Sequence, residues 1–111
     1  MDKSSLTALV DHHLGVAGSA NSGRSSETLY GGHEHVLRQT LIALQSGQTL
    51  DEHENPGEAT IQVLRGQIRL RAGDATIEAS AGELLIVPQS RHSLDALEDA
   101  AILLTVAKAL S

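Results

Sequence analysis

The sequence predicts an all-β domain, an antiparallel sandwich or barrel preceded by a short helix. From residue 28 onward, about eight short segments are either continuously apolar or alternate between apolar and polar residues. Glycine, proline, asparagine and aspartate separate these segments at close intervals. Strands that follow one another this closely favour an antiparallel sandwich or barrel over an α/β fold.

The first 27 residues predict a helix and an arm. Residues 4–14 fit a short helix that Ser4 or Ser5 can cap, with an apolar stripe of Leu6, Leu9, Val10 and Leu14. Residues 15–26 are rich in Gly, Ser and Ala, which is typical of a flexible linker. We therefore expect residues 1–27 to form a helix and flexible arm, and residues 28–111 to form the β domain.

Turn residues divide the β domain into strands. Pro56-Gly57 fits a type II turn, and Gly66-Gln67 fits a hairpin. Arg69 and Arg71 alternate with apolar residues, so their strand should present a charged face that pairs with nearby glutamates. The strands expected between the turns span residues 36–44, 50–55, 60–65, 68–72, 75–79, 84–87, 92–97 and 101–107.

Composition argues against several classes of partner. The net charge of −6 repels the phosphate backbone of nucleic acids. No apolar run is long enough to span a membrane, and a secretory signal is not expected. Tyr30 is the only Phe, Trp or Tyr in the chain, which argues against a cofactor held by ring stacking. With no cysteine for disulfides, the simplest expectation is a cytoplasmic protein.

Two motifs carry the functional information. The first opens at Gly47 and closes at Gly66, with His53, Asn55 and Ala59 between these two glycines. The second opens at Gly82 and continues through Pro88 to His92. Together they resemble the two signature motifs of the cupin family, and the resemblance spans roughly residues 36–107. The chain looks like a small single-domain bacterial cupin of the RmlC-like kind.

The resemblance implies a fold and a site. Cupins fold into a jelly-roll barrel, an antiparallel double-stranded β-helix, in which three histidines and one glutamate surround a metal. In this chain His53 and His92 stand at two of the histidine positions, although His92 comes one residue early. Asn55 replaces the other histidine, and Ala59 occupies the position of the glutamate.

This donor set is poorer than a metal site usually requires. Alternation along a strand puts His53 and Asn55 on one face, and His92 on a neighbouring strand can point toward them. Two imidazoles and one neutral amide remain, so the affinity for a metal should fall. Glu58 lies one residue off the inward register and reaches the site only if the Pro56-Gly57 turn redirects the chain.

Three functions remain open. The first is a sensor or carrier that binds a small organic molecule in a pocket containing His53, Asn55 and His92, with weak or no metal dependence. The second is a metal-dependent enzyme, a dioxygenase or isomerase, in which His53 and His92 hold Fe, Mn, Ni or Zn. The third, compatible with both, is an interaction module: a homodimer in which the N-terminal helix and arm cross to the partner.

The remaining histidines have simpler interpretations. His33 and His35 share a face if they lie on a strand, but no third donor is predictable nearby, so a solvent-facing strand start is expected. His12 and His13 are adjacent in the predicted helix and cannot face one partner together. We expect both to be solvated.

Overall fold

The computed structural model describes residues 1–53 and 57–108, and at position 53 it describes the backbone alone. One helix, α1, spans Leu6–Ser19. The nine described strands are β1 (Arg24–Tyr30), β2 (Leu37–Leu44), β3 (Thr49–His53), β4 (Gly57–Arg65), β5 (Gln67–Ala72), β6 (Ala75–Ser80), β7 (Leu84–Val87), β8 (His92–Ala96) and β9 (Ala100–Lys108).

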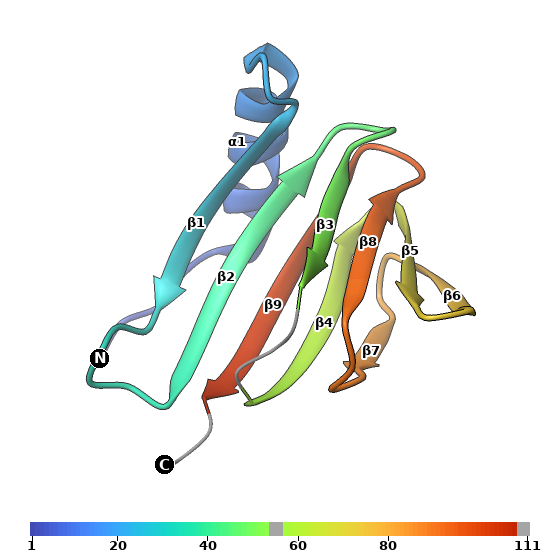
Figure 1. Cartoon of the computed structure of the whole chain (residues 1–111). Coiled ribbons are helices and arrows are strands. Elements are labelled where there is room, and N and C mark those ends of the chain that lie inside the picture. Colours follow the sequence, from blue (N-terminus) through green and yellow to red (C-terminus); the bar gives the residue numbers. More distant parts are fainter. Residues whose placement is uncertain (54–56, 109–111) are drawn as a thin grey trace.

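The strands form two antiparallel sheets. A five-stranded sheet has the order β1-β2-β9-β4-β7, and a four-stranded sheet has the order β3-β8-β5-β6. Figure 1 shows β3, β8 and β5 lying in front of the strands of the larger sheet, with α1 on its far side. This arrangement confirms the predicted all-β antiparallel fold and is that of a jelly-roll barrel.

An aliphatic core fills the space between the sheets. Along β4, Ala59, Ile61 and Val63 point inward and are buried, while the alternate residues face outward. The core also draws on the other sheet, where Ile68 is fully buried. Burying one such aliphatic side chain contributes about 1.5–3 kcal/mol, so this period-two alternation fixes which face of each strand is the inner wall.

Helix α1 packs on the outer face of the larger sheet. Ser5 caps it, because the Ser5 Oγ accepts a hydrogen bond from the Ala8 N–H at 3.2 Å. Val10 packs with Leu41 and Ala101 in a second, smaller core between the helix and the sheet. The helix therefore contacts strands of its own chain, mainly β1 and β2. The sequence had instead suggested that it crosses to a partner chain.

The linker expected at residues 15–26 is wrong. The helix continues to Ser19, with Ala17 fully buried, and β1 begins at Arg24 and pairs along β2. The sequence analysis missed β1 because this edge strand begins Arg-Ser-Ser-Glu. It has too few apolar residues to show an alternation of apolar and polar positions. A strand at the edge of a sheet can be this polar, since only part of it faces the core.

The segment between β1 and β2 also differs from expectation. Residues 31–36 are not a strand but a connection that contains a turn, and His33 and His35 are exposed in it. Tyr30 stacks on His35, with the ring centroids 4.8 Å apart and the planes 20° from parallel. The expected exposure of these two histidines is confirmed, whereas the expected strand start is wrong.

Gly66 explains why the first motif closes on glycine. Its φ of +78° lies in the left-handed region that side chains disfavour, and it forms the tight connection between β4 and β5. A Cβ placed there would collide with the main-chain carbonyl of Asp99. Because β4 and β5 belong to different sheets, this connection passes from one sheet to the other, and the hairpin expected at Gly66-Gln67 is wrong. Glycine at this position allows the connection to lie against the start of β9. Among the described residues, no helix is long and apolar enough to cross a membrane.

Candidate functional site

His92 is a polar residue that the barrel buries. It begins β8, and Leu94 and Ala96 follow on the same inward face of that strand. The His92 side chain is only 4% exposed. Its Nδ1 lies 2.9 Å from the main-chain carbonyl oxygen of Ser90. The fold thus seats an imidazole against an aliphatic wall and fixes the orientation of its ring.

The bond to Ser90 also selects the tautomer of His92. A carbonyl oxygen can only accept, so Nδ1 carries the hydrogen and donates it. In the neutral ring the lone pair then lies on Nε2. A histidine arranged in this way can accept a hydrogen bond from a hydroxyl or amide group, and it has the orienting bond that metal-binding histidines usually possess.

The backbone brings His53 next to His92. The two residues are direct partners in the ladder between β3 and β8. The register of this ladder shifts between Leu50 and His53, so one strand carries an extra residue there, as in a β-bulge. The two motif positions named from the sequence are therefore neighbours across two strands. Asn55, the third, lies outside the described residues.

The position of the missing carboxylate is occupied by an apolar wall residue. Ala59 is 5% exposed and belongs to the barrel core. Glu58 is exposed and lies on the opposite face of β4, because consecutive strand residues alternate. The possibility that Glu58 replaces the missing ligand is therefore contradicted: its carboxylate faces away from the barrel interior.

The described donors do not fit the four-ligand metal centre that the motifs resemble. His92 supplies one imidazole, and the position of the glutamate in the motif carries only the methyl group of Ala59. Among the described residues, no three His, Cys, Asp or Glu side chains are grouped closely enough to hold a metal. The chemistry that these residues support is binding through hydrogen bonds and aliphatic contact, not coordination by a complete set of ligands.

An ion pair links β3 to the segment just before His92. Arg91 Nε lies 2.8 Å from a carboxylate oxygen of Glu52, and each of these side chains neighbours one of the two motif histidines in sequence. Both are exposed, so the pair contributes at most about 1 kcal/mol. Its effect is positional, because it ties together the two strand ends that carry His53 and His92.

A second histidine site lies outside the barrel and was missed by the sequence analysis. His13 on α1 is 6% exposed, although the sequence suggested that it is solvated. Its Nδ1 lies 2.7 Å from the Ser25 hydroxyl, and its Nε2 lies 2.8 Å from the Glu27 carboxylate, both on β1. Since β1 was not foreseen as a strand, nothing in the sequence indicated these partners. The neighbouring His12 is exposed, as expected.

Comparison with solved structures agrees with this architecture. A conserved protein of unknown function from Streptococcus pyogenes is 27% identical, with a TM-score of 0.74 over 83% of this chain and 80% of that one. An RmlC-like cupin from Desulfovibrio desulfuricans is 25% identical, with a TM-score of 0.74 over 96% of each chain. A cupin superfamily protein from Desulfitobacterium hafniense is 18% identical, with a TM-score of 0.72 over 78% of each chain. A search of the curated proteins found no match.

Comparison with protein families finds a match to one family. Residues 40–107 match the Cupin domain family, a span that begins inside β2 and ends inside β9. That span contains both motifs, the buried His92, most of β2 and β9, and all the described strands between them. The two-sheet barrel and the family match lead to one conclusion: this chain belongs to the cupin family.

Proposed function

We propose that this cupin binds a small organic molecule inside its barrel and serves as a sensor or carrier with weak or no metal dependence. The observation that carries the proposal is His92, buried at 4% exposure with its ring held by Ser90. A buried polar group with a fixed orientation, set in an aliphatic wall, is what an organic ligand site requires. His53, Asn55 and His92 form the proposed pocket.

The proposed ligand is recognised by shape and by a few hydrogen bonds. The wall around His92 is aliphatic, so the ligand needs an apolar part that fits it. It also needs a polar group that can hydrogen-bond with the buried His92 imidazole. Tyr30, the one tyrosine, lies outside the barrel, so aromatic stacking contributes nothing to recognition.

Ligand binding can be tested on tag-free protein. Native mass spectrometry looks for a copurified molecule, and a thermal-shift screen of small hydroxylated compounds looks for stabilising ones. We expect hits that raise the midpoint of unfolding for the wild type and fail to do so for His92→Gln. His12→Gln, which changes an exposed histidine on α1, serves as the matched control and should respond like the wild type. If His92→Gln shows the same shifts as the wild type, the proposed pocket is wrong.

A second candidate is a metal-dependent enzyme, a dioxygenase or isomerase, that uses His53 and His92. The observation in its favour is the direct ladder pairing of these two positions. Elemental analysis of tag-free protein purified with Fe, Mn, Ni and Zn present separates the candidates. Near-stoichiometric metal that is lost in His53→Ala would favour the enzyme, whereas less than about one ion per ten chains would remove it.

A further inference from the structure

A small depression lies where the two sheets of the barrel end next to each other. Strand β6 is the last strand of the smaller sheet and β7 the last of the larger one, and the described strand pairings do not join them. Figure 1 shows the β5–β6 hairpin and β7 on the same side of the molecule, opposite β1. A depression of about 130 Å³ opens between these strands, and among the described residues that line it none is charged. We call it the edge slot; its lining includes Leu70, Ala72, Ala75, Thr76, Ile77 and Ile86.

Two isoleucines are exposed in the edge slot. Ile77 belongs to the inward face of β6, because it pairs with the buried Leu70 across the β5–β6 ladder, yet it is 53% exposed. Ile86 of β7 is 73% exposed and lines the other side. Exposed aliphatic side chains that converge on a cavity favour an apolar group as its occupant. The slot is too small for a protein partner, since a stable interface involves about 20–30 residues on each side.

The edge slot adjoins the buried histidine of the barrel. The β5–β8 ladder pairs Arg71 with Ser93, so its next position sets Ala72 beside His92. Directly opposed residues have Cβ atoms about 5 Å apart, and alternation from the core residues of both strands puts this pair on the inward face. Ala72 is in turn paired with Ala75 at the open edge. Two methyl groups therefore lie between the imidazole and the edge, and a ligand held at His92 can extend over them.

We propose that the edge slot binds the aliphatic part of the barrel ligand, whose polar end hydrogen-bonds with His92. This inference rests on the proposed function and adds a class of ligand: amphiphilic molecules with one small polar group and an uncharged aliphatic chain. A cavity of about 150 Å³ holds a benzene molecule, so a slot of about 130 Å³ fits about four to six carbon atoms. A charged group on the chain would lose its hydration there without gaining a partner.

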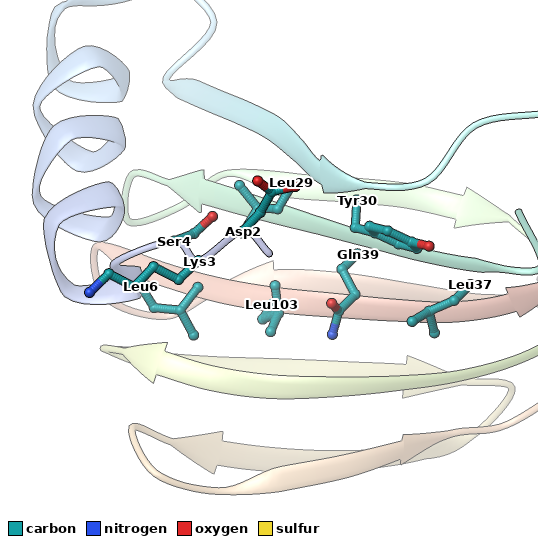
Figure 2. A pocket seen from close by; sticks show the side chains of 9 residues that line it. All are labelled: Asp2, Lys3, Ser4, Leu6, Leu29, Tyr30, Leu37, Gln39 and Leu103. Atoms are coloured by element: carbon teal, nitrogen blue, oxygen red, sulfur yellow. The ribbon is translucent and has the colours of Figure 1, made fainter.

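A second cavity has to be distinguished from the edge slot in a binding test. It measures about 430 Å³ and lies on the outer face of the larger sheet, beside the start of α1. Figure 2 shows Leu29, Tyr30 and Leu37 around it, with the N-terminal residues at its other end. The described residues that line it differ from those of the edge slot. The side chains that respond to a probe therefore identify the cavity that the probe occupies.

The straight-chain alcohols from 1-propanol to 1-octanol are the probes. A hydroxyl both donates and accepts hydrogen bonds, so it can pair with the imidazole in either role. Each methylene that enters the slot should tighten binding about two- to fourfold. 1-Hexanol should therefore bind about 10- to 60-fold more tightly than 1-propanol, and the gain should stop once the slot is full.

Isotopic labelling of the isoleucine and leucine methyl groups shows where the chain of the alcohol lies. In a nuclear magnetic resonance titration with 1-hexanol, the methyl signals of Ile77 and Ile86 should shift most. The same titration gives the dissociation constant of each alcohol. Shifts centred on Leu29 and Leu37 would place the probe in the other cavity and would overturn the proposal. So would a wild type that binds none of the alcohols.

Shortening the walls of the slot tests it independently. Ile77→Ala and Ile86→Ala should each weaken the binding of 1-hexanol at least about threefold and change that of 1-propanol by less than about twofold. Leu84→Ala is the matched control, because Leu84 is 61% exposed on β7 but does not line the slot. It should bind both alcohols like the wild type. Circular dichroism checks that each variant is folded.

His92→Gln separates this inference from the proposed function. The substitution changes only the partner of the hydroxyl, so it should weaken 1-propanol and 1-hexanol by the same factor. Binding that depends on His92 but is unchanged in Ile77→Ala and Ile86→Ala would overturn the edge slot and leave the proposed function standing. Binding that depends on the two isoleucines but not on His92 would overturn the link to His92, and with it the proposed function, although the slot would still hold an aliphatic chain.

Discussion

Replacing Gly66 with alanine should strongly destabilise the fold, for two reasons that add. A residue with a side chain at φ +78° costs about 1–2 kcal/mol relative to glycine. The new Cβ would also collide with the Asp99 carbonyl and lie only 2.9 Å from the Ala100 Cα. These are main-chain atoms of the segment that begins β9, so relief requires one of these two connections between the sheets to move. We expect a total loss of about 3–5 kcal/mol.

Two other glycines serve as comparisons that separate the cost of the backbone angle from the cost of the collision. Gly73 has φ +59° but no atom within 4 Å of an added Cβ, so Gly73→Ala should cost only about 1–2 kcal/mol. Gly15 lies inside α1 with open space around it, so Gly15→Ala should stabilise the protein by about 0.5–1 kcal/mol. Each of the three variants adds one methyl group to the wild type, and each does so in a different backbone environment.

Urea unfolding at one fixed protein concentration measures all three changes in free energy, and fixing the concentration keeps any dimerisation constant. In order of decreasing free energy of unfolding, we expect Gly15→Ala, the wild type, Gly73→Ala and then Gly66→Ala. If Gly66→Ala and Gly73→Ala cost the same, the contact with Asp99 contributes nothing and only the backbone angle matters. If Gly66→Ala is neutral, the explanation given for the closing glycine of the motif is wrong.

Three further changes test the packing by the same unfolding measurement. Ile68→Ala removes a fully buried side chain and should cost about 2–5 kcal/mol, and a cost below 1 kcal/mol would place Ile68 outside the core. His13→Ala removes the buried ring that joins α1 to β1 and should cost about 1–3 kcal/mol; an exposed histidine would cost almost nothing. Arg69→Ala breaks a largely exposed ion pair with Glu78 and should change stability by less than about 1 kcal/mol, a limit that a buried pair would exceed.

The barrel was predictable because its strands are encoded locally. Glycine and proline mark most of the turns, and the run at residues 84–87 coincides with β7. Arg69 and Arg71 face outward and pair with Glu78 and Asp95, so the expected charged face is confirmed, with aspartate as well as glutamate among the partners. In such segments period-two alternation and turn chemistry agree, so little depends on distant contacts.

The N-terminal region was not predictable in the same way. The sequence of β1 has weak strand character, and its pairing with β2 supplies the order that the sequence lacks. Burial of His13 depends on that pairing, because both of its partners lie on β1. Local patterns can identify a strand that forms the core. They miss one that is held mainly by its neighbour.

The sequence predicted which positions form the candidate site, but it did not predict the contacts that surround them. The motif spacing named His53 and His92, and the β3–β8 ladder makes them partners. The inward aliphatic position of Ala59 also follows from the motif. The Ser90 carbonyl that holds the His92 ring could not be foreseen, because it is a main-chain contact that depends on the path of the loop after Pro88.

Tyr30 gives this molecule a built-in optical reporter. With no tryptophan in the chain, near-ultraviolet absorption and intrinsic emission come from this one phenol. Its ring stacks on His35 and lines a cavity of about 430 Å³ beside the start of α1. A change in tyrosine emission would therefore report on the surroundings of Tyr30 alone, without a dye or a label.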